Sequence, residues 1–489
     1  MIYSFADFEL DADRAELRRE GARVHLEPQA FDLLHALVAR HDRVVGRDEI
    51  FQLIWGDRIV SDAALASRLR DVRRALGDEG REGRFIRTIK GRGVRFVAEV
   101  AGAEEAPSGG GDHARHAIPA LGVLPFAGAD DGIGEDIAAA LVAWRVFPVM
   151  TVSAPDAADP SLRYLVGGTL RRSGDTATLR LSLTDAPSQS LIWSERLSLS
   201  ADADGAWLED AAARAAGLVV LQVERTEARR GMSKTPEEMT PWELAIRAAW
   251  LSNRMNPGDL DAGLALATQA AEAAPDWLHP FTLIADCRFQ QAFQNLPIGA
   301  HEEAFAAALQ AAKAALDIDP SSWSAHALTG LGELWSNGNH DRALLHVNEG
   351  VRLNPSALKA YHFAGCVAGF AGDLDHALAA QSRMIRIDPT FRHRPVVEAD
   401  LALWHLLKGE FERARALLDR SVRWSTAHRR TYHRRIALFG LTGDAAAARE
   451  ACTALAAFGP MGGVERILGT YPFREDAHRE IFREGLIAG

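Results

Sequence analysis

Glycine and proline recur at a fixed spacing in the second half of this 489-residue chain. Pro320, Pro355 and Pro389 lie 35 and 34 residues apart, and Gly338 and Gly372 are again 34 apart. The segments between them are rich in alanine and have the apolar pattern of helices. A period of this length is typical of stacked helix pairs, each of which buries its apolar face against its neighbours. The spacing therefore predicts an all-α solenoid with a concave groove.

Each repeat carries the same local motif at its turn. The segments GNHDRAL, GDLDHAL, GEFERAR and GDAAAAR begin with a glycine suited to a turn between helices, and an alanine follows five residues later, at Ala343, Ala377, Ala414 and Ala448. A small residue at this position allows two helices to pack closely. These units resemble tetratricopeptide repeats, and about six of them would fill residues 241–462. Such repeats form a groove suited to a peptide, a helix or a partner protein.

The stretch from Gly46 to Val97 has a different pattern, in which arginines share a helix with a buried stripe. Ser61 is a suitable N-cap and Gly77 a suitable end, and the apolar residues between them recur at helical spacing, at Leu65, Leu69, Val72 and Leu76. The opposite face carries small and basic residues, namely Ala63, Ser67, Arg70 and Arg74, flanked by Arg68, Asp71 and Arg73. Such a face suits the major groove of DNA.

The distribution of charge supports a nucleic-acid partner, although the chain as a whole is acidic. The formal net charge is −11, yet residues 58–96 carry 11 basic and 5 acidic side chains. Residues 1–57 have the opposite bias, with 7 basic and 12 acidic side chains. Segregation of this kind is expected of a phosphate-binding face. It predicts binding to double-stranded DNA.

Short strands and two helices precede the arginine helix, and a basic hairpin follows it. The pattern predicts strands within 3–26, a helix from Pro28, a second helix over Arg47–Trp55, and a hairpin with the turn Lys90-Gly91-Arg92-Gly93. This order, with the segments LEPQAFDLLHALVARHDRVVGRDEI, VSDAALASRLRDVRRALGD and IRTIKGRGVRFV, resembles the winged helix-turn-helix domain of the OmpR/PhoB family over about residues 3–98. The resemblance implies that the arginine helix enters the major groove and that the hairpin, or wing, reaches the adjacent minor groove or its phosphates.

The resemblance also assigns DNA-contacting positions. Ser67, Arg68 and Asp71 match groove-facing positions of the recognition helix, Arg73 or Arg74 its basic end, Arg47 and Trp55 backbone-contacting positions, and Arg92 the wing. Arg70 and Lys90 join them through the charge pattern, so the expected DNA-binding residues are Arg47, Trp55, Ser67, Arg68, Arg70, Asp71, Arg73, Arg74, Lys90 and Arg92. Asp71 replaces a basic residue that is common in the family. It would accept a hydrogen bond from cytosine or pair with Arg68 or Arg74.

Residues 101–117 are rich in glycine, alanine, serine and proline and are expected to form a flexible linker. The next segment, 118–228, has three alternating strand patterns between a strand–helix–strand start and a closing helix. The pattern predicts an α+β sandwich and resembles the TolB N-terminal-like domain. Ligand sensing by this domain is compatible with the pattern, but no particular residue supports it.

The predicted fold class is therefore multidomain: an α+β winged helix, an α+β sandwich middle domain and an all-α tetratricopeptide-repeat solenoid. The expected boundaries are 1–100 for the winged helix, 101–117 for the linker, 118–228 for the middle domain, 241–462 for the repeats and 463–489 for a helical cap. The order resembles HilA-like rather than membrane-anchored CadC-like regulators, because no apolar run is long enough to span a bilayer. The receiver domain usual in two-component regulators is expected to be absent, so that control would come from the repeats.

Catalytic motifs are missing from the sequence. It has no G-x-x-x-x-G-K-[ST] loop, no G-x-S-x-G elbow and no H-E-x-x-H pair, so enzyme activity, cofactors and metals are not expected. Cys287, Cys366 and Cys452 lie far apart in apolar helical segments. They are expected to be buried free thiols of a cytoplasmic protein.

A basic patch in the repeats is open to two interpretations. Residues 383–435 carry 13 basic and 6 acidic side chains, among them Arg429, Arg430, Arg434 and Arg435. These four arginines either lie on a solvated helix face or form a docking surface for a partner.

The sequence as a whole predicts a DNA-binding transcriptional regulator. Its repeats would take a signal or bind a protein partner, and a homodimer is one possible assembly. The alternative is a repeat scaffold in which the winged helix contacts protein.

Overall fold

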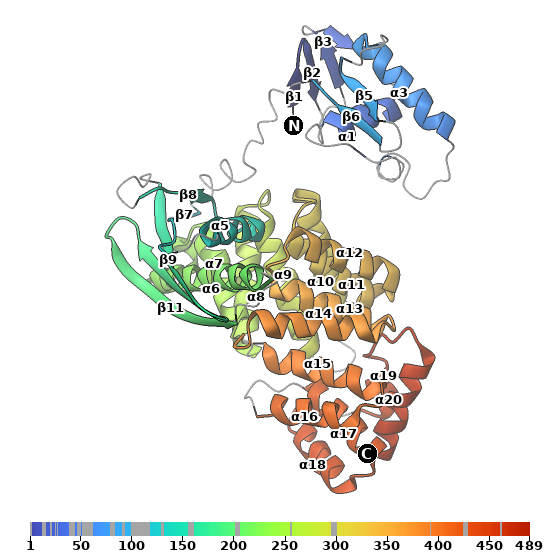
Figure 1. Ribbon diagram of the computed structural model, residues 1–489. Helices are drawn as coiled ribbons and strands as arrows, with labels where there is room; N and C mark the ends of the chain where they lie inside the picture. The colour runs from blue at the N-terminus through green and yellow to red at the C-terminus, as the bar shows by residue number, and fades with distance from the viewer. Residues whose placement is uncertain are drawn as a thin grey trace. The chain divides into compact units, whose positions relative to one another are not determined.

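The computed structural model describes the chain in segments, which are 2–11, 16–19, 22–24, 26, 28–38, 45, 50, 62–78, 84–89, 93–98, 118–128, 132–154, 161–200, 206–254, 257–294, 301–391, 393–423, 429–459 and 462–489. They belong to two compact units, Met1–Gly111 and Asp112–Gly489 (Figure 1). Across these segments, no helix has the length and apolar character that a membrane span needs.

The described part of the first unit has the order that the sequence predicts. It contains the strands β1 (Ile2–Phe5), β2 (Phe8–Asp11), β3 (Glu16–Arg19) and β4 (Ala22–Val24), the helices α1 (Pro28–Val38) and α3 (Asp62–Leu76), and the hairpin strands β5 (Ile86–Ile89) and β6 (Gly93–Phe96). β1 to β4 pair in sequence order as an antiparallel sheet. The helix expected over residues 47–55 lies outside the described residues, apart from Ile50.

Four phenylalanines connect the N-terminal sheet to the hairpin. Phe5 and Phe8 of the sheet meet Phe85 and Phe96 of the hairpin, and all four are buried. The ring centroids of Phe5 and Phe96 are 5.0 Å apart, and those of Phe8 and Phe85 are 5.7 Å apart, both pairs with edge-to-face geometry. Each buried ring contributes about 1.5–3 kcal/mol to folding. The wing is therefore anchored in the core of the unit.

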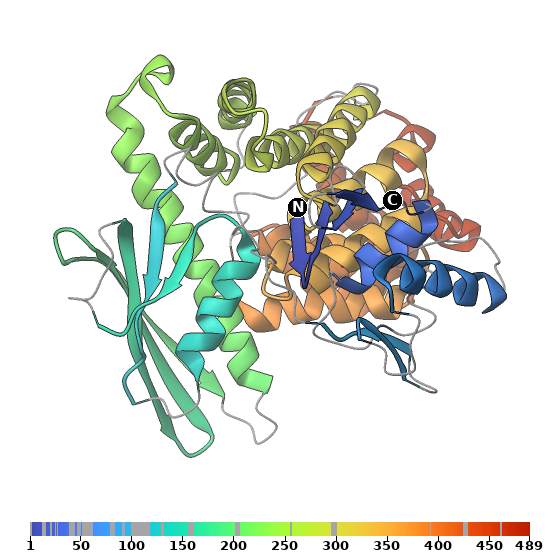
Figure 2. The same cartoon turned by 90° about the horizontal axis from the view of Figure 1, so that it is seen from above.

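The second unit begins with a mixed five-stranded sheet. Its strand order is β11-β10-β9-β7-β8, formed by β7 (Ala120–Val123), β8 (Val149–Thr151), β9 (Leu162–Ser173), β10 (Thr176–Asp185) and β11 (Ser190–Ser200). β9 to β11 form an antiparallel meander, and β7 runs parallel to β8 and β9. The helices α5 (Ile133–Trp144) and α6 (Ala206–Arg230) cover one face (Figure 2). This two-layer arrangement confirms the predicted α+β sandwich.

Antiparallel helix pairs follow and confirm the predicted solenoid. Two short 3-10 helices, η2 (Gly231–Ser233) and η3 (Pro236–Glu238), lead into them. The helices are α7 (Pro241–Ser252), α8 (Pro257–Ala273), α9 (Leu278–Gln294), α10 (His301–Ile318), α11 (Trp323–Asn337), α12 (His340–Leu353), α13 (Leu358–Phe370), α14 (Leu374–Ile387), α15 (Arg394–Leu407), α16 (Phe411–Ser421), α17 (Arg429–Thr442) and α18 (Ala445–Ala456). The last two helices, α19 (Val464–Leu468) and α20 (Asp476–Ala488), pack together, and α20 lies against α17.

The repeated turn motif has the geometry that its residues predict. Gly338, Gly372, Gly409 and Gly443 all have positive φ angles, of 61°, 100°, 76° and 73°. This left-handed conformation is strained for other residues and ends a helix in a tight turn. The alanine five residues after each glycine is buried, as close packing of the helices requires.

Helix α6 packs against the sheet and the repeats together. Residues from α6 and the sheet share one hydrophobic core with residues from α7, α8 and α9. Near its start, Asp210 forms ion pairs with Arg383 and Arg386 of α14, at 3.7 and 2.9 Å. Arg214 faces Asp388, just beyond α14, at 3.5 Å. The packing is therefore continuous between the segments 118–228 and 241–462.

A polar network at the end of α6 fixes this helix to both neighbours. The Tyr164 hydroxyl of β9 donates to the Glu227 carboxylate, and Arg230 donates to Tyr164 Oη at 2.7 Å and to Asp185 Oδ1 at 2.6 Å. Trp242 of α7 donates from Nε1 to Glu227 Oε2 at 3.3 Å. Burial and the neighbouring Glu227 carboxylate raise the pKa of Tyr164, so its hydroxyl stays protonated as the donor. One carboxylate thus connects the sheet, α6 and the first repeat helix.

We expect Glu227→Ala to lower the free energy of unfolding of the second unit by about 2–4 kcal/mol. The substitution leaves the buried Tyr164 hydroxyl, the Trp242 N–H and one side of Arg230 without their acceptor. Urea titration followed by tryptophan fluorescence measures this loss. Glu195→Ala, an exposed glutamate of β11, is the matched control and should change stability by less than about 0.5 kcal/mol. Equal stability of the two variants would contradict the role of the network.

Candidate nucleic-acid interface

Helix α3 has one buried and one open face, as its sequence predicts. Leu65, Leu69, Val72 and Leu76 are all buried in the core of the first unit. The helix ends at Gly77, whose φ of 66° is left-handed. Ser61, the expected N-cap, lies outside the described residues. The apolar stripe therefore fixes which side chains α3 turns toward solvent.

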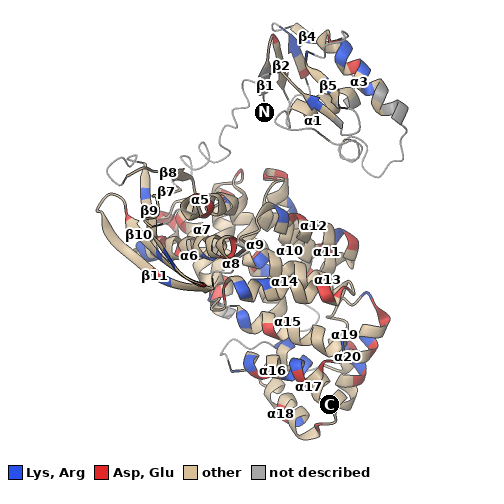
Figure 3. Ribbon diagram, in the orientation of Figure 1, with Lys and Arg blue, Asp and Glu red and all other residues tan. Residues whose placement is uncertain are grey.

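The open face of α3 carries arginines around a serine (Figure 3). Arg70 and Arg74 are exposed, and Ser67 is half-buried on the turn before them. Arg68 and Asp71 form an ion pair at 3.3 Å, one turn apart. Of the two roles open to Asp71, the structure shows the pairing with Arg68. A partly exposed pair of this kind contributes at most about 1 kcal/mol, so a DNA base can compete for either partner.

Arg73 connects the helix to the wing. Its guanidinium Nη2 donates to Thr88 Oγ1 at 2.9 Å and to the Ile86 carbonyl oxygen at 3.3 Å, both on β5. The family resemblance gives Arg73 or Arg74 a DNA contact at the basic end of the helix. Arg73 is thus held by β5, and Arg74 is the exposed arginine at this end.

Asp78 is a second link between helix and wing, and the sequence analysis did not single it out. Its carboxylate, 5% exposed, accepts hydrogen bonds from three successive backbone N–H groups, those of Arg84, Phe85 and Ile86, at 2.6, 2.9 and 2.9 Å. The signal was an aspartate directly after the glycine that ends α3. Such a residue is usually explained as a local turn, whereas this one binds the start of a strand.

The remaining expected contacts fall outside the part of the chain that the structure describes. They are Arg47 and Trp55, expected at the DNA backbone, and Lys90 and Arg92, expected at the wing tip. The structure thus brings Ser67, Arg68, Arg70, Asp71 and Arg74 onto one face of α3 beside the hairpin.

Comparison with known proteins agrees with this geometry. Residues 21–96 match the family described as "Transcriptional regulatory protein, C terminal". The segment is an OmpR/PhoB-type DNA-binding domain, and it contains α3 and the hairpin β5–β6.

Relatives extend the similarity over most of the chain. The transcriptional regulator HilA of Salmonella typhi is 22% identical over 426 residues, which cover 82% of this chain and 73% of that protein. The transcriptional regulatory protein KdpE of Mycobacterium tuberculosis is 30% identical over 92 residues, 19% of this chain and 41% of that protein. Among solved structures, a thermophilic TPR protein of Thermus thermophilus has 16% identity and a TM-score of 0.31, covering 47% of this chain and 98% of that one.

The four arginines singled out in the basic patch of the repeats each have a contact within the second unit. Arg434 is 3% exposed and binds Asp400 Oδ1 at 2.5 Å. Arg430 lies with its guanidinium carbon 4.3 Å from the Tyr471 ring centroid and donates to the Thr470 carbonyl oxygen. Arg435 pairs with Asp419 at 2.7 Å, and Arg429 donates to the Phe458 carbonyl oxygen. The expectation of an open docking surface is therefore corrected at Arg434, because it is buried and paired with Asp400, whereas Arg429, Arg430 and Arg435 are half-buried.

Three of the buried groups follow the repeat period. Cys366, Asp400 and Arg434 are 34 residues apart in sequence and lie in contact, since Asp400 accepts from the Cys366 thiol at 3.3 Å and from Arg434. His362 donates from Nε2 to the same carboxylate at 2.9 Å. The ligand atoms of His362, Cys366 and Asp400 lie within 4.8 Å of one another, the spacing of a metal site. The Arg434 guanidinium on the Asp400 carboxylate opposes a cation there, so the group is a hydrogen-bonded core.

We expect Asp78→Ala to destabilise the wing and the end of α3 by about 2–4 kcal/mol. Two of the three N–H groups that it binds belong to the buried residues Phe85 and Ile86, and these would lose their acceptor. Hydrogen exchange of peptides from residues 62–98, measured during a urea titration, reports the loss of stability in this region. Asp71→Ala, which breaks only the exposed pair with Arg68, is the control and should cost less than about 1 kcal/mol. A wing that exchanges no faster in Asp78→Ala than in the control would refute the anchoring role.

Proposed function

We propose that this chain is a DNA-binding transcriptional regulator in which α3 reads base edges in the major groove and the wing contacts the neighbouring backbone. The observation that carries the proposal is the face of α3, where Arg70 and Arg74 stand exposed opposite a fully buried stripe. The family match to residues 21–96 supports it. The similarity to HilA, a protein named as a transcriptional regulator, supports the same assignment for the chain as a whole.

The roles of individual residues follow from their placement. Ser67, Arg68 and Arg70 are proposed to face bases, because they lie on the central part of the open face. Arg74, with Arg47, Trp55, Lys90 and Arg92 carried over from the family resemblance, is proposed to hold phosphates. Phosphate contacts position the domain, and base contacts specify the sequence.

The repeats are proposed to bind a protein partner. Helical repeats of this kind present extended surfaces to other chains. In the described part of the chain, α6 lies against the first repeat helices and reaches α14, and α20 lies against α17. A partner is therefore proposed to use the repeat surface that α6 and α20 leave uncovered.

The deciding experiment is selection of bound DNA from a random pool by the full chain. An enriched motif is expected from the proposal. Two copies of the motif at a fixed spacing would mean that two chains bind together. A pool without enrichment would favour the alternative, in which the winged helix contacts protein.

We expect Arg70→Ala to weaken binding to the selected DNA by about 1–3 kcal/mol and to relax the preference at one position if Arg70 reads a base. If the affinity instead falls equally for all DNA sequences, and the slope of log affinity against log salt concentration becomes smaller by about one, Arg70 contacts a phosphate. Arg23→Ala, an exposed arginine of β4 on another element, serves as the control in the same binding assay. Unchanged affinity of Arg70→Ala would overturn the proposed orientation of α3.

A further inference from the structure

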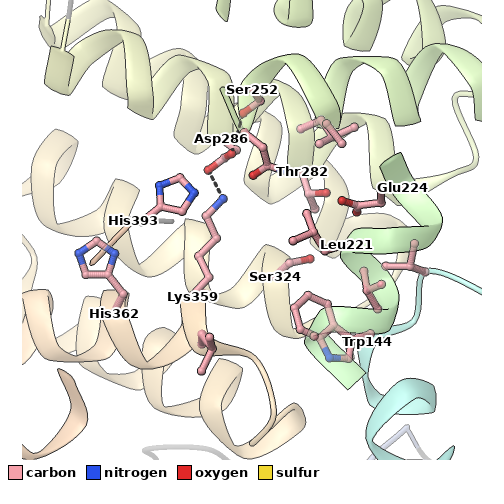
Figure 4. Close-up of a pocket in the computed structure, with 18 of the residues that line it drawn as sticks. Trp144, Leu221, Glu224, Ser252, Thr282, Asp286, Ser324, Lys359, His362 and His393 are labelled. Atoms are coloured by element: carbon pink, nitrogen blue, oxygen red, sulfur yellow. Dashed lines mark hydrogen bonds and ion pairs between the residues drawn. The ribbon is translucent and has the colours of Figure 1, made fainter. Parts of the chain in front are cut away.

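Helix α6 and the repeats line a partly open cavity that the DNA-binding proposal does not use. Its volume is about 830 Å³, within the usual range for small-molecule pockets. α5 and α6 form one wall, and α7, α9, α11 and α13 supply side chains on the others (Figure 4). The lining is largely aromatic and aliphatic, with Trp144, Leu221, Phe289 and Phe363 among its members.

The wall made by α5 and α6 is held in place against the repeats. The Trp144 and Trp323 rings meet edge to face, with centroids 5.4 Å apart, and Trp323 Nε1 donates to the Trp144 carbonyl oxygen at 3.3 Å. Arg145 pairs with Asp319 at 2.8 Å. Together with the ion pairs of Asp210, these contacts hold α5 and the first half of α6 against the repeats beside the cavity.

Most charges around the cavity are already balanced. The Asp286 carboxylate accepts from Lys359 Nζ at 2.5 Å, from Gln290 at 2.9 Å and from Ser252 at 3.1 Å. The Arg214 guanidinium pairs with the Asp388 carboxylate at 3.5 Å. Arg225 and Arg229 are both exposed, and solvent screens their charge.

The Glu224 carboxylate differs from the paired groups of the cavity. It points from α6 toward Thr282, on the other side of the cavity from His362 and His393 (Figure 4). Within the segments that the structure describes, no hydrogen bond or ion pair satisfies it. Burial raises the pKa of the Glu224 carboxyl to about 7, against the opposing effects of Lys359 and Arg225. The carboxylate is half-buried, so it can be reached by a ligand in the cavity, and a carboxylate without a protein partner binds a cation or a hydrogen-bond donor.

We propose that this cavity binds a small organic cation, an amine or guanidinium group on an apolar body, with Glu224 as the counter-ion. The cationic group pairs with the Glu224 carboxylate. The apolar body lies against the side chains contributed by Leu221, Trp144 and the repeat helices. The site lies wholly within the second unit and does not depend on DNA binding.

The test is isothermal titration of the full chain, without DNA, with tryptamine, phenethylamine and octylamine at pH 8. Indole-3-propionate, which has the ring and chain length of tryptamine but an anionic end, is the matched comparison. At least one amine is expected to bind saturably at one site, and tryptamine about tenfold or more tightly than indole-3-propionate. Failure of all three amines to bind, or tighter binding of the anion, would overturn the proposal.

Substitution of the counter-ion gives the second readout. Glu224→Gln keeps the size of the side chain and removes its charge, so amine affinity is expected to fall about tenfold or more. Glu195→Gln, an exposed glutamate of β11, should leave affinity unchanged. Amine binding that is equal in the two variants would place the ligand elsewhere and refute the assignment.

The pH dependence gives a third readout. The charged and titratable groups around Glu224 are Arg225 on α6, His279 and Asp286 on α9, Lys359 and His362 on α13, and His393 before α15. Protonation of Glu224 removes the counter-ion, so amine affinity is expected to fall about tenfold from pH 8 to pH 6. Burial lowers the pKa of His279 to about 4, so this ring stays neutral over that range. The fall should disappear in Glu224→Gln, and its persistence there would assign it to the other histidines and contradict the proposal.

Discussion

Helix α6 buries one apolar side against the five-stranded sheet and another against the first repeat helices, and the core of the second unit depends on both contacts. One side completes the core of the five-stranded sheet, while the other continues into the first repeat helices. A two-layer sheet domain and a helical solenoid usually meet through a linker, but here a 25-residue helix belongs to both. Its polar ends are matched on each side, by Asp210 with α14 and by Glu227 with β9 and α7. The sheet, the cavity wall and the repeats therefore share one helix as a common structural element.

Features that depend on local periodicity could be predicted from the sequence. The turn glycines and the buried alanines of the repeats follow from a spacing that neighbouring residues determine. The same is true of α3, whose apolar stripe defines its open face. Each of these features needs only a helix and a preferred backbone conformation, which a short segment specifies by itself.

Features that depend on distant segments could not be predicted in the same way. Arg73 and Asp78 bind the hairpin, and neither the sequence of α3 nor that of the hairpin alone determines how the two are positioned. In the sequence, Arg434 belongs to a basic stretch, whereas in the structure it is paired with Asp400, one repeat earlier. The period itself held a usable signal, because equivalent positions of successive repeats are stacked. A polar residue 34 positions from an oppositely charged one is a candidate for an internal pair.

The two links between α3 and the wing have a mechanical consequence. Arg73 and Asp78 tie the end of the helix to β5 and to the residue just before it through four hydrogen bonds, so helix and hairpin move as one rigid body. If the domain binds DNA as proposed, the distance between the helix in the major groove and the wing on the neighbouring backbone is then fixed. DNA whose groove width or twist does not match this distance must deform, at an energy cost set by its own sequence. Selectivity would then arise at base pairs that no side chain touches.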